Sequence, residues 1–106
     1  MHARTAVSVS PDANVAFLDY DRVPGAVRVR GRMPGDRFRP LGMREAKKLK
    51  EFFIDNKVPF WERDRVPLLT SEGAILWVVG HRISDEVKVN SETTRVLQIE
   101  VSTENE

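Results

Sequence analysis

The amino-acid sequence predicts an α+β domain, in which one main helix packs on a mostly antiparallel sheet. Short apolar or alternating segments, separated by turn residues, lie on both sides of a single stretch with helical periodicity. This order of strands, helix and strands is typical of helices packed on one face of an antiparallel sheet. A chain of 106 residues without cysteine suits one domain with a modest core, which packing alone must stabilise.

The N-terminal third predicts two strands and two turns. Residues 1–14 show no clear period and are expected to form a loose lead-in, and residues 15–18 form a short apolar strand. Pro24-Gly25 predicts a turn, because proline presets φ and glycine accepts positive φ. In residues 26–32 valines alternate with arginines, which indicates a strand with an apolar and a cationic face. Pro34-Gly35 predicts a type II turn, followed by irregular or extended chain over residues 36–40.

The one convincing helix is predicted over residues 44–56. Leu49, Phe52, Phe53 and Asn56 fall at i, i+3, i+4 and i+7, with Ala46 one turn earlier. The lysines of this segment would then occupy its remaining, solvent-facing sides. Pro59 forces the preceding residue away from helical geometry and is expected to end the helix.

The C-terminal half predicts only strands. Residues 68–69 and 74–79 read as a hairpin around the turn at 71–73, with a second strand that is apolar enough to be central and that ends at Gly80. Residues 95–101 alternate between apolar and polar side chains, as a strand with one buried face does. One domain is therefore expected over residues 15–102, with a tail at 103–106.

The net charge of +1 conceals a segregation of charge along the chain. Residues 22–50 contain ten cations and two anions, a net charge of +8, and the rest of the chain contains seven cations and fourteen anions, a net charge of −7. Such a basic segment is typical of a surface that binds nucleic acid. It is equally typical of solvated faces that pair with the acidic remainder, so the charges alone do not decide.

The residues that catalysis or metal binding would need are absent. Only His2 and His81 could ligate a metal as histidines, and His81 is expected to be a locally hydrogen-bonded loop residue. Ser71, His81 and Asp85 lack the context of a nucleophile elbow, and no glycine-rich phosphate loop occurs. We expect no catalytic residue, metal site or cofactor in this chain. Without a signal peptide or a membrane-spanning run, a cytoplasmic location is expected.

Aromatic residues near the basic segment raise the possibility of base stacking. Trp77 lies in an apolar strand and is expected in the core. Trp61, which follows Phe60 and precedes a charged stretch, is expected to be half exposed, with a packing role favoured over stacking.

The strings VRGRMPGDRFRPLG at residues 29–42 and KKLKEFF at 47–53 resemble the C-terminal domain of tRNA(Ile)-lysidine synthetases. Asp55, Val58-Pro59, Arg63, Pro67, ILWVVG at 75–80 and Arg82-Ile83 continue the pattern, so the resemblance covers about residues 17–101. Each piece is common, but their joint occurrence in register is specific.

The resemblance implies a fold like the domain shared by lysidine synthetases and the β-subunit of phenylalanyl-tRNA synthetase. In that family a separate N-terminal domain uses ATP and Mg²⁺ to join lysine to the wobble cytidine of an isoleucine tRNA, and the C-terminal domain contacts the acceptor stem. The family's S-G-G-x-D-S nucleotide loop is missing here, so the ligase chemistry is assigned to no residue of this chain. The resemblance implies an RNA-binding role for seven basic residues: Arg32, Arg37, Arg39, Lys47, Lys48, Lys50 and Arg63.

Three functions therefore remain open at this point. The first is a module that binds the acceptor stem through phosphate and 2′-OH contacts. The second is a protein-interaction domain, whose basic face docks on the catalytic domain or on another partner. The third, a free-standing enzyme, requires the resemblance to mislead.

Overall fold

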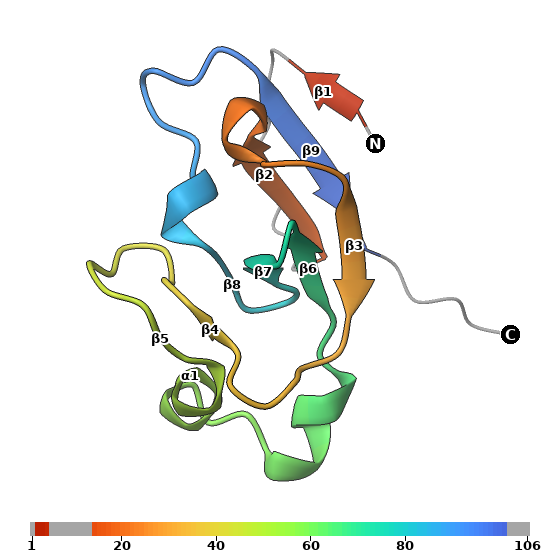
Figure 1. Cartoon of the computed structure of the whole chain (residues 1–106), viewed down its shortest axis with the longest axis vertical. Coiled ribbons are helices and arrows are strands. Elements are labelled where there is room, and N and C mark those ends of the chain that lie inside the picture. The colour runs from red at the N-terminus through yellow and green to blue at the C-terminus, as the bar shows by residue number, and fades with distance from the viewer. Residues whose placement is uncertain (1, 5–13, 102–106) are drawn as a thin grey trace, which may run out of the picture.

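The computed structural model describes residues 2–4 and 14–101, which form nine strands, one α-helix and three short 3-10 helices (Figure 1). The strands are β1 (His2–Arg4), β2 (Val15–Asp19), β3 (Val27–Arg30), β4 (Arg37–Phe38), β5 (Lys47–Lys48), β6 (Leu68–Ser71), β7 (Ala74–Val78), β8 (Arg82–Ile83) and β9 (Val96–Glu100). The helices are α1 (Leu49–Asp55), η1 (Tyr20–Arg22), η2 (Phe60–Arg65) and η3 (Asp85–Val87). The lead-in over residues 5–13 and the tail at 103–106 lie outside the described residues.

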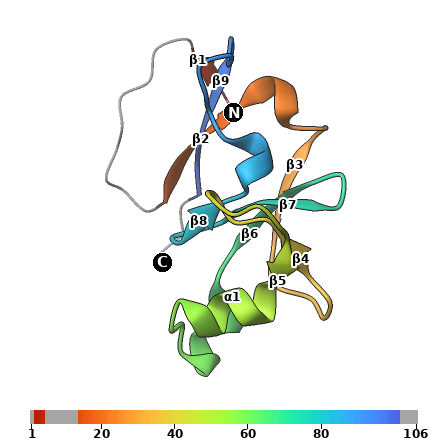
Figure 2. The same ribbon diagram turned by 90° about the vertical axis from the view of Figure 1, so that its left-hand side faces the viewer.

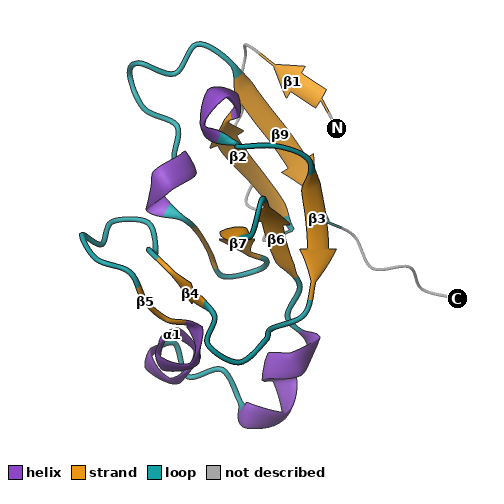
Figure 3. Cartoon of the chain, viewed as in Figure 1, coloured by secondary structure: helices purple, strands orange, loops and turns teal. Residues whose placement is uncertain are grey.

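Every strand pairing among the described residues is antiparallel, which confirms the predicted fold class. One sheet has the order β1-β9-β2, a second has the order β3-β6-β7-β8, and β4 and β5 form a separate ribbon (Figure 3). The pairing of β1 with β9 was not indicated by the sequence, because three residues are too few to show a period.

The hairpin of β6 and β7 lies at the centre of the molecule. Its Leu68 and Val78 pack with α1 and β4 in one apolar cluster, and its Leu69 and Trp77 pack with β2 and β9 in another. Figure 2 shows the two layers that result, with α1 on one side of the hairpin and the β1-β9-β2 sheet on the other. Burial on both faces is what the continuous apolar run of residues 75–79 predicted.

The turn of this hairpin has the geometry that the strand twist requires. Glu72 and Gly73 both have positive φ, 50° and 83°, as in a type I′ turn. Gly80, at φ 83°, turns the chain after β7, as predicted. Gly35 also has positive φ, 84°, and the Asp36 amide donates to the Met33 carbonyl at 3.2 Å, which confirms the second turn.

The first predicted turn, at Pro24-Gly25, does not form in the expected way. Gly25 is not among the residues with positive φ. Its amide donates to the Ser71 Oγ at 2.9 Å, and a Cβ at this position would lie 2.7 Å from the Glu72 Oε2. Glycine therefore allows a close approach between β3 and the central hairpin here.

The predicted helix begins five residues later than expected, at Leu49. Residues 44–46 precede β5 in loop conformation, and Lys47 and Lys48 pair with β4, in register with Phe38 and Arg37. The Leu49 amide, the first of α1, donates to the Asp36 carbonyl at 2.9 Å. Pairing with β4 outweighs the helix propensity of the lysines, since that propensity is worth only a few tenths of a kcal/mol per residue.

The helix also ends before Pro59 can act on it. Lys57 adopts positive φ, 57°, and its amide donates to the Ile54 carbonyl at 3.0 Å, while the Val58 amide donates to the Phe53 carbonyl at 2.9 Å. These two bonds form a Schellman motif, which satisfies the last carbonyls of the helix.

The predicted alternation in β3 holds at Val27, which packs against the second apolar cluster, and at the exposed Arg28, but it fails at the next two residues. Val29 is 54% exposed, whereas the Arg30 side chain is only 30% exposed and is held by Asp36. The strand lies at the edge of its sheet, so one apolar residue remains in solvent and one arginine is drawn inward by a local carboxylate.

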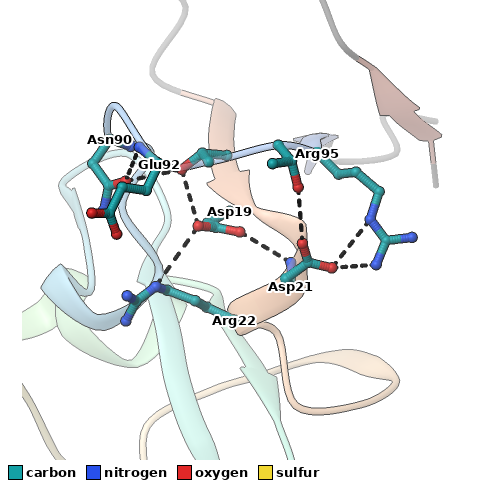
Figure 4. A network of polar contacts seen from close by, with 8 residues as sticks. Asp19, Asp21, Arg22, Asn90, Glu92 and Arg95 are labelled. Atoms are coloured by element: carbon teal, nitrogen blue, oxygen red, sulfur yellow. Dashed lines mark hydrogen bonds and ion pairs between the residues drawn. The ribbon is translucent and has the colours of Figure 1, made fainter.

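A network of polar contacts connects the end of β2 and η1 with the segment that precedes β9 (Figure 4). Asp19, which is buried, accepts hydrogen bonds from the Asp21 amide at 3.1 Å and from the Thr93 hydroxyl at 3.0 Å, and its carboxylate lies 3.7 Å from Arg22. Arg95 donates a hydrogen bond to Asp21, and this hydrogen bond lowers the pKa of the Asp21 carboxyl. The Arg95 guanidinium also lies over the Tyr20 ring. The cations of this network are thus engaged within the fold.

Candidate nucleic-acid interface

The helix α1, the β3–β4 connection and η2 meet at one end of the molecule (Figure 1). Residues of these segments line a groove of about 520 Å³. One wall is the turn of residues 32–36, the second is the start of α1, and Asp64 reaches in from η2. Its lining residues are Arg32, Met33, Pro34, Gly35, Asp36, Lys48, Leu49, Lys50 and Asp64. Three of the seven predicted RNA-binding residues are therefore brought together here.

Asp36 fixes the relative position of the turn and the helix. Its carboxylate accepts two hydrogen bonds from Arg30, at 2.9 and 3.0 Å, and one from the Met33 amide at 2.8 Å, while its carbonyl accepts from Leu49. Burial disfavours the charged carboxylate, but these hydrogen bonds and the Arg30 charge together lower the pKa of Asp36. A carboxylate that is held ionised in this way orders the floor of the groove.

Arg32 joins the groove to η2. Its Nε donates to the Asp64 carboxylate at 2.7 Å, and its guanidinium lies 6.0 Å from the Phe53 ring and 5.9 Å from the Phe60 ring. Its side chain is only 22% exposed. Arg32 therefore has a fixed position between the basic wall and the aromatic residues.

Three other predicted residues have partners within the fold. Lys47 forms an ion pair with Asp55, and Arg39 lies 3.4 Å from Asp85. The Arg63 Nε donates to the Val58 carbonyl at 2.9 Å. None of Arg39, Lys47 or Arg63 lines the groove.

The remaining three predicted residues, Arg37, Lys48 and Lys50, are exposed and form no ion pair with any described residue. Arg37 and Lys48 lie directly opposite each other in the β4–β5 ribbon. Like charges in this arrangement are destabilising, and an anion between them would remove the repulsion. The expected projection of Lys47, Lys48 and Lys50 from one helix is wrong, because only Lys50 belongs to α1.

The exposure of Trp61 is greater than the sequence predicted, and its neighbour Phe60 is exposed as well. Phe60 is 70% exposed and Trp61 is 76% exposed, so the packing role that the sequence favoured for Trp61 is wrong. Trp77, at 3% exposure, lies in the core as predicted. The pattern of η2, in which two aromatics precede four charged residues, was the available signal, since such a segment has no period that would bury them.

Ser71, His81 and Asp85, which were singled out in the sequence, have structural contacts of their own. Among the described residues no group of three or more metal-ligating side chains occurs, and no helix is long and apolar enough to cross a membrane. Ser71 contacts Gly25, and Asp85 contacts Arg39, Lys88 and the Gly42 amide, so the two do not form a triad with His81. His81 packs edge-on against Phe52 and Phe53, and partial burial lowers the pKa of its imidazole.

Comparison with known proteins identifies the family of the chain. The sequence model of one family, described as the TilS substrate C-terminal domain, matches residues 27–101. The chain is 52% identical over 90 residues to a tRNA(Ile)-lysidine synthase of Caldanaerobacter subterraneus subsp. tengcongensis, and 51% identical over 94 residues to that of Dehalococcoides mccartyi. These alignments cover 85% and 89% of the chain but only 19% and 20% of the relatives, so the chain spans about a fifth of their length.

Two solved structures share the fold. A crystal structure of a TilS C-terminal domain superposes with a TM-score of 0.72 at 31% identity, covering 95% of this chain and 82% of that one. An N-terminal fragment of the phenylalanyl-tRNA synthetase β-subunit from Pyrococcus horikoshii superposes with a TM-score of 0.66 at 20% identity, covering 79% of this chain and 26% of that one, which shows a likeness of fold alone. The chain therefore belongs to the TilS substrate C-terminal domain family and is a C-terminal domain of the tRNA(Ile)-lysidine synthase type.

Proposed function

We propose that this chain is a tRNA-binding accessory domain, which recognises the acceptor stem of an isoleucine tRNA for a cytoplasmic tRNA(Ile)-lysidine synthase. Membership of the family and the basic groove support this proposal. The chain contains no phosphate-binding loop. In this proposal ATP, Mg²⁺ and the joining of lysine to cytidine belong to the catalytic domain of the parent enzyme, which is the second partner.

The observation that carries the proposal is the pair of opposed cations, Arg37 and Lys48. They lie across the two-stranded ribbon from each other, exposed and without an ion pair among the described residues, and Lys50 follows on the first turn of α1. Phosphates spaced along a duplex backbone would neutralise cations in this arrangement and release counterions. A domain that uses backbone contacts reads the A-form shape of a stem rather than its base sequence.

Fluorescence anisotropy with a labelled acceptor-stem minihelix, measured over a series of salt concentrations, tests the proposal. With about three exposed cations in contact with phosphates, log affinity should fall linearly with log salt, with a slope of roughly −2 to −3. The double variant Arg37→Gln/Lys48→Gln should weaken binding by about tenfold or more at low salt and should make the slope shallower by about 2.

The matched control is Arg22→Gln/Arg95→Gln, which removes the same charge at the end of the molecule shown in Figure 4. It should leave affinity nearly unchanged, and circular dichroism should confirm that both variants are folded. If both variants lose affinity equally, only net charge matters and the groove has no special role. If the wild-type chain binds no minihelix at low salt but binds a separately prepared catalytic domain, the domain is a protein-docking module instead.

A further inference from the structure

The exposed aromatic residues of η2 are not explained by the fold. Phe60 and Trp61 are adjacent in sequence and are 70% and 76% exposed, and neither belongs to an apolar cluster of the core. Large aromatic side chains in water lose the stabilisation that burial would give them. Two of them side by side therefore indicate a surface that is covered when a ligand binds.

The Phe60 ring is contacted by two arginines. The Arg63 guanidinium lies 5.7 Å from the centre of the Phe60 ring and is itself anchored to the Val58 carbonyl. The Arg32 guanidinium lies 5.9 Å from the same ring and is anchored to Asp64. These contacts hold Phe60 in position before any ligand binds, which reduces the conformational entropy that the side chain would lose on binding.

Trp61 lies beside a second hollow, separate in its lining from the groove. This hollow has a volume of about 390 Å³, and its lining residues are Trp61, Glu62, Arg65, Val66, Pro67 and Val79. Its one cation, Arg65, is balanced by Glu62, so the hollow fits a flat, partly apolar group such as a nucleobase beside the indole ring. Arg32 and Asp64 line the groove, and Phe60 contacts Arg32, so the aromatic pair adjoins the basic surface.

Interleaved aromatic and arginine side chains beside a basic groove favour a single-stranded nucleic acid over an apolar protein surface. Every nucleobase has a π-face that can stack on an aromatic ring, and each nucleotide carries the phosphate that an arginine binds. Paired bases within a duplex do not expose those faces. We infer that Phe60 and Trp61 form a stacking site for unpaired nucleotides that continue from the stem bound in the groove. This inference rests on the proposed function.

Two minihelices with the same stem test the inference, one blunt-ended and one with a short single-stranded 3′ extension. The wild-type chain should bind the extended RNA about tenfold more tightly, because stacking on an aromatic side chain is worth about one such factor or more per base. The extended RNA, but not the blunt one, should also quench tryptophan fluorescence. Trp77 is buried, so the change reports on Trp61.

Two aromatic variants and one control separate stacking from a simple apolar contact. Phe60→Ala/Trp61→Ala should bind both RNAs with the affinity that the wild type has for the blunt one. Phe60→Leu/Trp61→Leu keeps apolar side chains without π-faces and should lose the preference equally. The control Val29→Ala/Val89→Ala removes two other exposed apolar side chains and should keep the preference intact.

The possible failures are distinguishable. Equal wild-type affinity for the two RNAs overturns the stacking site but leaves the groove and the proposed function standing. Retention of the preference by the leucine variant overturns stacking in favour of contact with any apolar side chain. Binding of neither RNA by the wild type overturns the proposed function itself, together with the stacking site.

Discussion

The single residue Asp36 links the two walls of the groove, because its carboxylate accepts from the Met33 amide and its carbonyl accepts from the Leu49 amide. Replacement of Asp36 by asparagine should lower the free energy of unfolding by about 1–3 kcal/mol at neutral pH, since it removes charge-assisted hydrogen bonds at a largely buried position. The folded-state pKa of Asp36 lies below its unfolded value. Its stabilisation is therefore present above about pH 4 and is lost as the pH falls through the folded pKa.

Urea denaturation of the wild type and of Asp36→Asn at several pH values measures this effect. The difference between the two proteins should shrink below about pH 4. A difference that stays constant down to acid pH would contradict the prediction. Asp64→Asn is the control, because the Asp64 side chain is 79% exposed and its ion pair with Arg32 should contribute less than about 1 kcal/mol.

The positions of the basic residues could be predicted from the sequence, but their partners could not. Lys47 and Lys48 are neighbours with the same charge, yet one forms an ion pair with Asp55 and the other has no ion pair among the described residues. Arg32 finds its carboxylate thirty-two residues away. Such pairings depend on which elements the fold brings together, and the RNA-binding role of the seven residues stays a prediction.

Among the elements, α1 has a C-terminal cap that can be improved. Lys57 occupies the left-handed position of the Schellman motif, where a Cβ costs about 1 kcal/mol and glycine is preferred. Lys57→Gly should therefore raise the free energy of unfolding by several tenths of a kcal/mol to about 1 kcal/mol. Glu51→Gly, at an exposed position in the first turn of the helix, should lower it by about the same amount.

Chemical denaturation followed by circular dichroism distinguishes the two substitutions. Destabilisation by both would mean that Lys57 does not adopt the left-handed conformation in solution.

The sequence predicted the strands of the central hairpin from apolar runs on either side of a turn, and it predicted the apolar face of α1 from a complete helical period. It failed at residues 44–48, where an apparently helical stretch of basic and small residues pairs with β4. Local propensity there was too weak to compete with an extended partner that lies nine residues or more upstream. Among the turn glycines, Gly35 and Gly73 have the positive φ that local turn geometry predicts. Gly25 does not, and a Cβ at its position would instead lie too close to Glu72, which is distant in sequence.

At the scale of the whole molecule, the central hairpin belongs to both apolar clusters, so the clusters should unfold together. Phe53→Ala in the first cluster and Leu97→Ala in the second should each lower the free energy of unfolding by about 2–5 kcal/mol. Both should shift one common transition. Trp77 fluorescence, recorded in a Trp61→Phe background, and far-ultraviolet circular dichroism should give coincident curves for every variant.

Separate transitions by the two probes would show that the α1 layer and the β1-β9-β2 layer are independent units. The overall fold was predictable because alternation, one helix and the family resemblance agreed. The groove was not, because its walls come from segments far apart in sequence.

The arginines of β3 also bear on how copies of the protein meet at high concentration. β3 is an outer strand of its sheet, so one row of its backbone amides and carbonyls faces away from β6. An outer strand that reads Val-X-Val-X with apolar X would be a template for a strand from another chain, and growth of an intermolecular sheet could begin there. In this protein X is arginine at both positions. Arg30 is paired with Asp36, but Arg28 is exposed, and two identical edges that approach each other must bring the two copies of this charge together. A residue that gives the segment its basic character therefore also discourages aggregation.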